Sequence, residues 1–526
     1  MNKKIQVWLP LLFSVAVIAG MLIGYKLRDT QPGKSFFSLE KARPVQEVLN
    51  LISNKYVDEV KTNVISDSAI IAILNRLDPH SVFIPAQELQ GVNEDIAGNF
   101  FGIGIEFNIF DDTLNVLNVV PDGPSFNAGI KIGDKLIAVN DSVIAGKKVT
   151  NETIRTLLRG DLGTKVTVRV FRNGKLQPIA IVRGVIPVSS VDASYMLAPG
   201  TGYIKLNKFS QVTYREFMKA LEGLQKQGLK KLVLDLRGNG GGVLDEATAI
   251  ADEFLSGDKL ITYTEGIHFP KKEYRCQREG LFENGELVVL ADEGSASASE
   301  ILMGALQDWD RATIIGRRSF GKGLVQEQYD LSDGSALRLT VARYYTPIGR
   351  SIQRSYKNGQ KAYYDEISNR FLDGEVSTAD SVKNDTTKIY TTKSGKKLYG
   401  GGGITPDIFI PVDTSFYTTN MSRIYFRGTI GDFAYKFYLR NTAKLLAYKS
   451  PGDFVKDFSF TDDDWNDFKT EAAKDSISLT YVNTKEKTDI INRIKSSIAR
   501  QRWRNEGFYE MLNTQDNAIK KALEVI

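Results

Sequence analysis

Hydrophobic and polar positions change their spacing several times along the chain. Apolar residues three or four positions apart, the spacing of one helix face, recur through residues 40–90, and the polar stretch 78–81 ends that pattern. Residues 98–184 instead carry short apolar runs separated by turns, with one amphipathic helix over 149–159. The spacing therefore predicts a helical region over 26–97 and a compact, strand-rich module over 98–184.

The middle of the chain alternates strands with helices. A buried-type strand over 232–236 precedes a glycine-rich turn and a helix over 244–255. A second such strand, over 287–291, precedes a helix that begins near residue 298. Strand, turn, helix and strand in this order are typical of parallel units, so we expect an α/β core over 185–412.

The last third of the chain contains a polar stretch and then more helices. Residues 355–400 are rich in Lys, Asp, Ser and Thr, which indicates an insertion in the form of a loop or lid. Residues 490–498 and 519–526 each carry an apolar stripe at helical spacing, so we expect a helical extension over 413–526. Together the segments predict a multidomain α/β (α+β) fold.

The N-terminus carries an uncharged, apolar segment. Two lysines precede residues 5–25, and the apolar core of this stretch is about 18 residues long, short for a spanning helix and long for a signal peptide. Trp8 and Tyr25 lie at its two edges, where interfacial aromatic residues belong. We expect an uncleaved single-pass anchor over 1–25 in the cell membrane, with a cleaved signal as the alternative. The bulk of the chain would then be exported to the periplasm or another extracytoplasmic space.

Composition narrows the classes of function. The 526 residues are 42% hydrophobic and 25% charged, which argues against global disorder and against a polytopic membrane protein. A net charge of +5 is too weak over this length to indicate nucleic-acid binding. The single cysteine, Cys276, excludes an internal disulfide and a Cys-rich zinc site. Any catalytic pair that includes a histidine must use His80 or His268, the only two in the chain.

The first chemical candidate is a serine between a predicted strand and a predicted helix. Ser295, Ser297 and Ser299 lie at this junction, where the N–H groups of the helix could stabilise an oxyanion. Ser297 and Glu300 also have the spacing of a capping box, in which the serine only stabilises the helix end. This segment by itself favours the cap, and the nucleophile is the alternative.

The second candidate is Lys322, which lies between Gly321 and Gly323. Glycines let the backbone approach another group closely, although a surface lysine is the ordinary interpretation. Ser319 and Lys322 have the Ser-x-x-Lys spacing of penicillin-binding enzymes, which place this serine at a helix start. Because the two glycines would break such a helix, we reject that interpretation.

The third candidate is the glycine-rich turn over 235–242. It lacks the Gly-Lys-Ser/Thr of a phosphate loop, and Val243 stands where a dinucleotide-binding turn needs its third glycine, so it matches neither nucleotide-binding motif. For the chain as a whole we expect no cofactor and no metal. A turn that exposes N–H groups can still bind an oxyanion. A serine, a lysine and this turn suit a Ser/Lys dyad, whose lysine must have its pKa lowered from about 10.4 toward about 7–8.

These motifs resemble those of the carboxyl-terminal processing proteases, also called tail-specific proteases, in which a PDZ domain precedes a Ser/Lys peptidase core. The resemblance extends from about residue 77 to residue 407. The motifs that carry it are Leu77-Asp78-Pro79-His80-Ser81, Phe101-Gly102-Ile103-Gly104, Gly129-Ile130-Lys131-Ile132-Gly133-Asp134, Asp235-Leu236-Arg237-x-Asn239-x-Gly241-Gly242, Gly294-Ser295-Ala296-Ser297-Ala298-Ser299-Glu300, Phe320-Gly321-Lys322-Gly323-x-Val325-Gln326, Tyr344-Tyr345-Thr346-Pro347-x-Gly349-Arg350-Ser351-Ile352-Gln353 and Gly403-Ile404-x-Pro406-Asp407.

The resemblance implies a role for five catalytic positions. Ser297 would be the nucleophile, Lys322 the general base and Gln326 the residue that orients the lysine. The main-chain N–H groups of Gly242 and Ala298 would form the oxyanion hole. In a straight strand the Cα atoms of Lys322 and Gln326 would lie about 13 Å apart, so the chain must bend for their side chains to meet.

The resemblance also implies that residues 98–184 form a PDZ domain, with a β-barrel-like sheet, that reads substrate C-termini. An apolar C-terminal residue would enter a pocket, and the following strand, 105–109, would pair with the incoming tail. The ordinary alternative is a glycine-bearing turn that only closes the sheet. The residues expected to bind the tail are Phe101, Gly102, Ile103, Gly104 and Ile105.

The expected function is that of a serine endopeptidase that cleaves exported proteins near or from their C-termini. Its expected partners are protein or peptide C-termini and the membrane, but no nucleic acid; a homo-oligomer is left open. One alternative is a catalytically silent, membrane-anchored PDZ adaptor, which the loss of Ser297 or Lys322 would have favoured. The other is a serine acyltransferase or lipase that uses His80 or His268 as its base.

Overall fold

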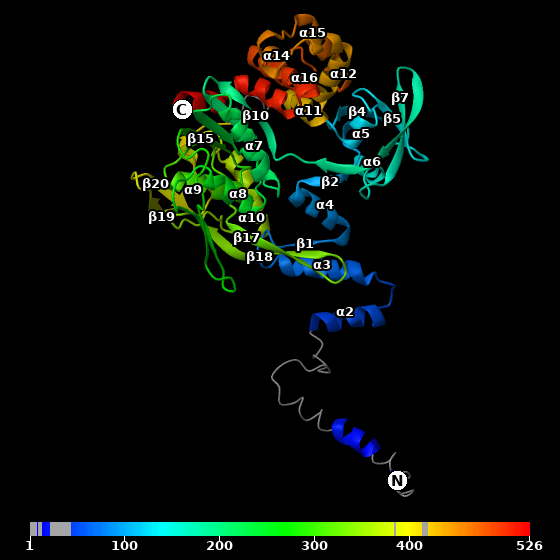
Figure 1. The fold of residues 1–526 in the computed structure, drawn as a ribbon, viewed down its shortest axis with the longest axis vertical. Coiled ribbons are helices and arrows are strands. Elements are labelled where there is room, and N and C mark those ends of the chain that lie inside the picture. The colour runs from blue at the N-terminus through cyan, green and yellow to red at the C-terminus, as the bar shows by residue number, and fades with distance from the viewer. Residues whose placement is uncertain (1–7, 9–12, 22–43, 383–384, 413–418) are drawn as a thin grey trace, which may run out of the picture. The chain divides into compact units, whose positions relative to one another are not determined.

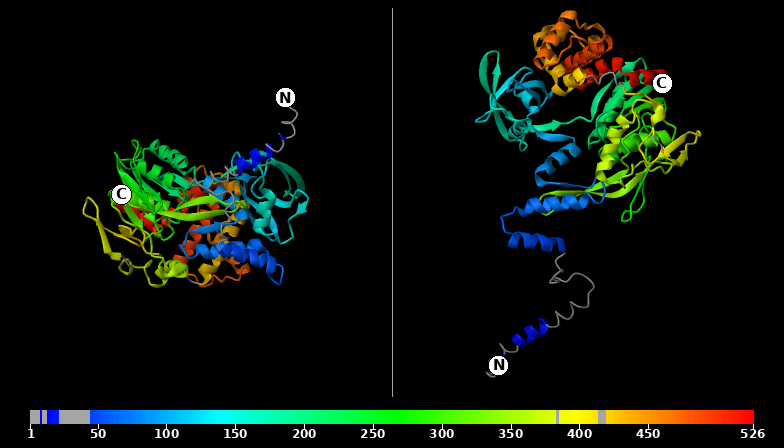
Figure 2. Two further views of the ribbon diagram at one scale, coloured as in Figure 1. Left: turned by 90° about the horizontal axis from the view of Figure 1, so that it is seen from below. Right: turned by 180° about the vertical axis from the view of Figure 1, so that it is seen from behind.

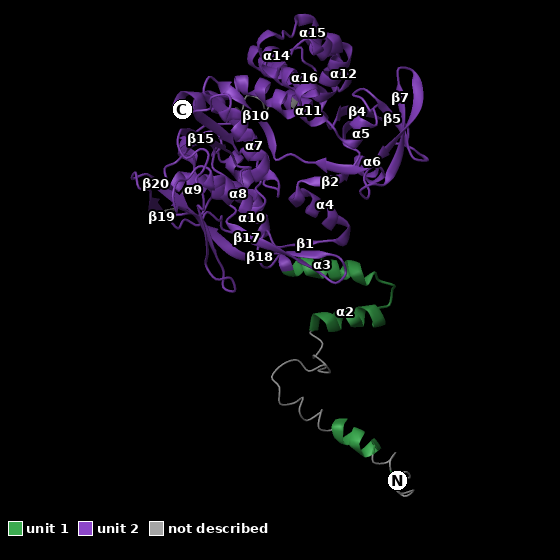
Figure 3. Cartoon of the chain, in the orientation of Figure 1, with its two compact units in different colours: residues 1–73 green, residues 74–526 purple. Residues whose placement is uncertain are grey.

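The computed structural model describes residues 8, 13–21, 44–382, 385–412 and 419–526. These residues form two compact units, 1–73 and 74–526 (Figure 3). Most of the predicted anchor, residues 1–25, lies outside the described ranges. Within those ranges, no helix combines the length and the apolarity that a membrane crossing requires.

The predicted helical spacing over residues 40–90 is confirmed, with one exception. It forms α2 (Pro44–Lys55), which buries none of its side chains, α3 (Thr62–Leu74) and α4 (Ala86–Ala97). The exception is β1 (Val82–Ile84), a strand within the region expected to be helical. Three residues are too few to show a period, and β1 forms because a strand far along the chain pairs with it.

The 98–184 module contains a six-stranded antiparallel sheet, in the order β3-β4-β5-β7-β8 with β6 beside β5. Buried aliphatic side chains from the sheet pack against α6 (Asn151–Leu158), whose N-terminus is capped by the Thr150 side chain. A short helix, α5 (Pro124–Asn127), follows β4, and β2 (Asn99–Gly102) pairs with β9 (Gly184–Pro187). The strands are β3 (Ile105–Phe110), β4 (Thr113–Val119), β5 (Lys135–Val139), β6 (Ser142–Val143), β7 (Lys165–Arg172) and β8 (Lys175–Val182).

The predicted α/β core is built on a second six-stranded sheet, in the order β10-β11-β12-β15-β16-β21 (Figure 1). The strands are β10 (Val191–Ala198), β11 (Thr201–Leu206), β12 (Lys231–Asp235), β15 (Glu286–Ala291), β16 (Thr313–Gly316) and β21 (Ile408–Phe409). β10 is antiparallel to β11 and the other pairs are parallel. α7 (Thr213–Gln225), α8 (Leu244–Asp252) and α9 (Ala298–Asp308) contribute to the hydrophobic core on one face of this sheet.

A third sheet adjoins the core and joins segments that are distant in sequence. Its order is β1-β18-β13-β14, with β17 beside β18. β17 contains the predicted site residue Gln326, and β18 pairs with β1, which follows the 78–81 motif. The added strands are β13 (Leu260–Glu265), β14 (Lys272–Arg275), β17 (Leu324–Asp330) and β18 (Ala336–Tyr345).

The polar stretch 355–400 is not an irregular loop, so that prediction is wrong in form. It contains α10 (Gly359–Leu372), η1 (Ala379–Ser381), β19 (Asp385–Thr391) and β20 (Lys397–Gly400). Its polar residues misled the prediction because several of them are buried in ion pairs. The guanidinium of Arg318 donates to Glu375 (2.6 Å), and that of Arg370 donates to Glu366 (3.0 Å). Paired charges can be buried within regular structure, which composition by itself does not reveal.

The described part of residues 413–526 is helical, as predicted. A cluster rich in aromatic residues forms its own core, in which Ile490, Ile494 and Ile498 of the first predicted stripe are buried. The longest helix, α16, has a non-helical residue, Arg504, within it. The elements are α11 (Thr419–Arg427), α12 (Thr429–Arg440), α13 (Thr442–Leu446), α14 (Pro451–Asp457), α15 (Asp462–Lys474), α16 (Thr484–Leu512), η3 (Asn513–Gln515) and α17 (Asn517–Val525).

The last helix, α17, belongs to the α/β core rather than to this extension. Ile519 and Ala522 pack with Val233 and Leu290, whereas Leu232, the neighbour of Val233, packs on the opposite face of the sheet. The C-terminal end of the chain accordingly lies beside the core sheet, and the views from different sides agree on this position (Figures 1 and 2). α17 therefore covers the face of the sheet that α7, α8 and α9 leave open.

We expect Ile519→Ala to destabilise the α/β core by about 2–5 kcal/mol, because it leaves a cavity between α17 and the sheet. Thermal unfolding followed by circular dichroism measures the effect. Leu523→Ala, on the more exposed side of the same helix, is the matched control and should change stability much less. Equal effects of the two substitutions would contradict the packing of α17 on the sheet.

Candidate active site

Two turns lie side by side at one edge of the core sheet. β12 and β15 are adjacent parallel strands, so the glycine turn (residues 236–242) and the serine segment (residues 292–300) leave the sheet at the same edge. The two are hydrogen-bonded to each other, since Ala296 N–H donates to the carbonyl of Asn239 (3.0 Å). The parallel pairing thus brings together two of the three segments that the sequence singles out.

Only the middle serine of the serine segment is accessible. Ser295 and Ser299 are 0% exposed, and their hydroxyls donate to the carbonyls of Leu236 and Asn239 (both 2.9 Å). Ser297 is partly exposed and lies at the start of α9, with φ 56° and ψ −114°. Such a backbone conformation is strained for a residue with a Cβ and occurs mainly at functional sites. Ser295 and Ser299 therefore fasten the turns together, and Ser297 presents its side chain.

The capping box predicted for Ser297 and Glu300 is present, and it does more than cap the helix. The Glu300 carboxylate accepts the main-chain N–H of Ser297 (2.9 Å), and it also accepts those of Gly321 (2.7 Å) and Lys322 (2.9 Å). Glu300 is 0% exposed, and burial raises its pKa although these donors oppose the rise. One buried carboxylate therefore fixes the backbones of Ser297 and Lys322 relative to each other.

A second group, Tyr344, also joins the serine and the lysine. Its hydroxyl lies 3.1 Å from the carbonyl oxygen of Ser297 and 2.6 Å from that of Lys322. Tyr344 belongs to one of the motifs that carry the resemblance, but it lies 47 residues after Ser297, and no local pattern assigns it this role. The two side chains, both within the described residues, are not hydrogen-bonded to each other: no bond joins Ser297 Oγ to Lys322 Nζ.

The side chains of Lys322 and Gln326 meet, which a straight strand would not allow. Lys322 Nζ donates to Gln326 Oε1 (2.8 Å). β17 begins only at Leu324, and its pairing with β18 shifts register between Val325 and Gln326, where a bulge re-aims the side chain. Gly321 has φ 87°, which favours glycine and turns the chain ahead of the lysine.

The 78–81 motif completes the surroundings of Lys322. Gln326 Nε2 donates to the main-chain carbonyl of His80, and Asp78 Oδ1 accepts the N–H groups of His80 (2.8 Å) and Ser81 (2.9 Å). Burial, with a contribution from Arg338, lowers the pKa of Lys322 to about 8. A lysine in this range can lose its proton near neutral pH and act as a base.

Glycine is required where the glycine turn meets Ser297. A Cβ on Gly241, which has φ 95°, would lie 2.7 Å from Ser297 Cβ and 2.9 Å from Ala298 N. A Cβ on Gly242 would lie 1.9 Å from the carbonyl oxygen of Phe209. Ala298 is the first residue of α9, and the N–H groups of a first turn have no partner within their helix. The space in front of Ala298 N is therefore kept open for an acceptor, as an oxyanion hole requires.

The remaining nucleophile and base candidates lie elsewhere or are engaged. His268 is exposed in the loop between β13 and β14. The His80 ring hydrogen-bonds the hydroxyl of Tyr363 (2.9 Å), and burial and Lys322 lower its pKa to about 4. The buried hydroxyl of Ser319 bonds Glu300 and accepts from Ile404 N–H (2.7 Å). Burial raises the pKa of Cys276 to about 12, which makes its thiolate scarce.

The predicted tail-binding residues lie together in the 98–184 module. Phe101 and Gly102 end β2, Ile105 begins β3, and Gly104 between them has φ 75°. The carbonyl of Ile103 accepts from Ser125 N–H (2.9 Å). This loop borders a cavity of about 990 Å³, which is separate from Ser297 and Lys322.

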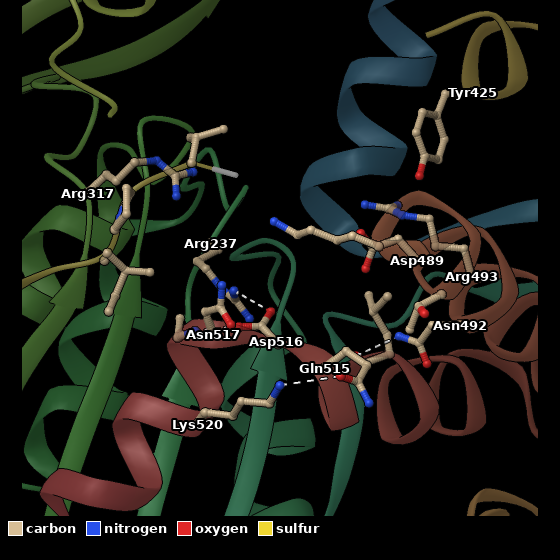
Figure 4. Close-up of a pocket in the computed structure, with 18 of the residues that line it drawn as sticks. Arg237, Arg317, Tyr425, Asp489, Asn492, Arg493, Gln515, Asp516, Asn517 and Lys520 are labelled. Atoms are coloured by element: carbon tan, nitrogen blue, oxygen red, sulfur yellow. Dashed lines mark hydrogen bonds and ion pairs between the residues drawn. The ribbon is translucent and has the colours of Figure 1, made fainter. Parts of the chain in front are cut away.

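A larger cavity, of about 1260 Å³, lies between the core sheet and the C-terminal helices and contains none of the predicted catalytic residues. At its edge Arg237, which follows β12, donates to Asp516 (2.8 Å), as Figure 4 shows. Arg237 also pairs with the buried Asp235 (2.6 Å), whose pKa it and Lys205 hold below the usual range although burial opposes them. These contacts tie the glycine turn to the residues just before α17.

Three regions of the chain match families of known proteins. Residues 200–359 match the model of peptidase family S41, and residues 102–182 match the model of the PDZ domain. Residues 420–504, within the C-terminal extension, match a family of unknown function (DUF8443).

Two curated relatives match more than half of the chain. The carboxy-terminal-processing protease of Bartonella bacilliformis is 36% identical over 313 residues, which are 58% of this chain and 71% of the relative. The carboxy-terminal processing protease CtpB of Bacillus subtilis is 33% identical over 334 residues, 62% of this chain and 67% of the relative. Among solved structures, the photosystem II D1 C-terminal processing protease is 26% identical, with a TM-score of 0.37, over 70% of this chain and 86% of that one.

We expect Gly241→Ala to lower the reactivity of Ser297 toward a small acylating inhibitor by at least about 100-fold. The added methyl group would fill the space between Ser297 Cβ and Ala298 N. The rate of covalent modification, followed by intact-protein mass spectrometry, measures the effect.

Gly240→Ala is the matched control for this substitution, because a Cβ on Gly240 would meet no atom within 4 Å. It should react at the wild-type rate. If Gly241→Ala were acylated as fast as Gly240→Ala, the space beside Ala298 N would have no part in the reaction.

Proposed function

Because the chain belongs to the carboxy-terminal processing proteases, and so is an S41 peptidase with a PDZ domain, we propose that it is a serine endopeptidase that uses a Ser297–Lys322 dyad and cleaves exported proteins near their C-termini. One observation carries the assignment of the dyad. Lys322 has a pKa near 8, and its Nζ is held by Gln326 while Glu300 ties its backbone to that of Ser297.

In the proposed mechanism neutral Lys322 accepts the proton of Ser297 Oγ as Oγ attacks the scissile carbonyl carbon. The N–H groups of Gly242 and Ala298 bind the oxyanion that forms. Lys322 then donates the proton to the leaving amine, the C–N bond breaks, and an ester remains on Ser297. Water, deprotonated by Lys322, hydrolyses the ester and restores the serine.

Gln326 and Glu300 act through the lysine and the serine rather than on the substrate. A neutral amine has one lone pair, and a hydrogen bond from Nζ to Gln326 Oε1 limits the directions in which that lone pair can point. Gln326 is itself held by the main-chain carbonyl of His80. The 78–81 motif therefore contributes its backbone to the site, which makes a base role for the His80 ring unnecessary.

We expect both Ser297→Ala and Lys322→Arg to abolish hydrolysis of a protein substrate while the fold is kept. Alanine has no nucleophile, and arginine does not lose its proton at any useful pH. Wild-type kcat/KM should rise about tenfold from pH 7 to pH 9, because the neutral fraction of a lysine with a pKa of about 8 grows over that range. Steady-state cleavage assays over this pH range measure both effects.

Ser299→Ala is the control for the serine, since its hydroxyl donates to Asn239 and does not reach the substrate side of the turn. It should keep activity and lose about 0.5–1.5 kcal/mol of stability. If Ser297 were only a helix cap, Ser297→Ala would remain active and lose about 0.5–2 kcal/mol. A rate that follows a group near pH 6.5 and disappears in His268→Ala would contradict the lysine base.

The cellular location is a second part of the proposal and rests on the apolar segment at residues 5–25. We expect this segment to anchor the chain in the cell membrane, with the catalytic part on the exported side. Mass spectrometry of the mature N-terminus tests the anchor, together with extraction of membranes at alkaline pH. An N-terminus that begins within or just after residues 5–25, on a protein found in the soluble exported fraction, would instead show a cleaved signal.

A further inference from the structure

Helix α10 lies in the insertion (residues 355–400), outside the segments that carry the resemblance to known peptidases. The region that matches peptidase family S41 ends at residue 359, which is the first residue of α10. The polar composition of the insertion predicts only a loop or lid. In the structure α10 instead contacts the two segments that meet around Lys322.

α10 holds the first of these segments, the 78–81 motif, through two neighbouring tyrosines. The hydroxyl of Tyr364 donates to the main-chain carbonyl of Pro79 (2.8 Å). The hydroxyl of Tyr363 hydrogen-bonds Nε2 of the His80 ring (2.9 Å), and the two rings meet edge to face with centroids 5.3 Å apart. Tyr363 is only 2% exposed, so its hydroxyl is shielded from water. The motif is thus fixed at two successive residues by one helix.

The 78–81 motif passes this restraint on to Lys322. The main-chain carbonyl of His80 accepts from Gln326 Nε2, and Gln326 Oε1 accepts from Lys322 Nζ (2.8 Å). His80 therefore has its ring bonded to α10 and its carbonyl bonded to the side chain that holds the lysine. A shift of His80 would reach the lysine amine through a single intervening side chain.

The other end of α10 holds the segment that leads into Lys322, residues 318–321. Arg370 Nη1 donates to the main-chain carbonyl of Ser319 (2.8 Å). Arg370 is buried, and Glu366, one helical turn before it, accepts from its Nε (3.0 Å). Because its charge is paired, this arginine can stay buried while it binds the backbone of the segment.

Aromatic packing joins the two held segments to each other. The rings of His80, Phe320 and Tyr363 have centroids between 5.3 and 6.3 Å apart. One ring comes from the 78–81 motif, one from the segment before Lys322 and one from α10. The guanidinium of Arg354 lies 4.2 Å from the Phe320 centroid and 4.1 Å from that of Tyr363. Tyr363 is therefore the point at which α10 touches both segments.

We propose that α10 positions the catalytic base: its two tyrosines hold the 78–81 motif in a place from which Gln326 aims the amine of Lys322 and keeps it from water. The inference rests on the proposed role of Lys322 as the base. Tyr363 and Tyr364 are positioning residues, because they act on the lysine through the motif.

Loss of this support should change the protonation of Lys322 as well as its place. Burial lowers the pKa of Lys322, with a contribution from Arg338 of β18, whereas Glu300 of α9 and Asp78 act to raise it. Water that entered beside a loosened motif would favour the charged amine and raise that pKa. His80 also faces the amine, but burial lowers its pKa to about 4, so its ring stays neutral above pH 7. The rate should therefore fall most near pH 7, where the neutral amine is already scarce.

The experiment measures steady-state cleavage of a protein substrate by the full chain from pH 7 to pH 10. Tyr363→Phe removes one hydroxyl and keeps the ring in its packing. We expect kcat/KM to fall about tenfold at pH 7 and to stay within about twofold of wild type at pH 10, with the loss in kcat and KM unchanged. The rate at which a small acylating inhibitor modifies Ser297, followed by intact-protein mass spectrometry, should show the same pH dependence.

Two further variants make the result specific. Tyr364→Phe changes a half-exposed side chain, so it should fold even if Tyr363→Phe does not. It should lower the rate about threefold at pH 7 and recover at pH 10. Tyr390→Phe makes the same chemical change in the β19–β20 hairpin of the insertion, where Tyr390 pairs with Leu398, and should leave the rate unchanged at every pH.

The outcomes separate this inference from the function on which it rests. Folded Tyr363→Phe and Tyr364→Phe proteins with the wild-type pH profile, or with an equal loss at pH 7 and pH 10, would overturn the role of α10 and leave the dyad standing. A wild-type rate that does not rise between pH 7 and pH 9, or an active Lys322→Arg protein, would overturn the lysine base and this inference with it.

Discussion

The Glu300 carboxylate is a fully buried acceptor for main-chain N–H groups from the two segments that carry Ser297 and Lys322. A buried charge without such donors would be costly, so the two segments can pack around Glu300 only in an arrangement that satisfies it. The hydroxyl of Tyr344 reinforces that arrangement from the carbonyl side. Removing Glu300 would therefore change the relative positions of Ser297 and Lys322, the proposed dyad, rather than a single contact.

The surrounding fold serves to bring these segments to one place. The parallel pairing of β12 and β15 sets the glycine turn beside the serine segment, and the bulged β17 turns Gln326 toward Lys322. Burial then lowers the pKa of Lys322 to about 8. A lysine that is poised in this way needs no histidine, which agrees with a chain that has only two.

The C-terminal region has two different relations to the peptidase. α17 covers a face of the core sheet, and Asp516 just before it holds Arg237 at the glycine turn. α12 and the kink of α16 instead contact β3 of the PDZ domain. The same region thus contacts both the peptidase core and the PDZ domain, through different helices.

The sequence by itself determined the order of the elements, because periodicity and turn residues are local properties, and its motifs selected Ser297, Lys322 and Gln326. Only the tertiary structure decided which of three neighbouring serines is accessible, since Ser295 and Ser299 are buried by hydrogen bonds to the glycine turn. It also gave roles to Glu300, Tyr344 and the His80 carbonyl, and it placed α17 on the core sheet. The physical reason is the same in each case: burial, a lowered pKa and the partner of a buried carboxylate arise from residues far apart in the chain, and no local pattern records which distant segment will supply them.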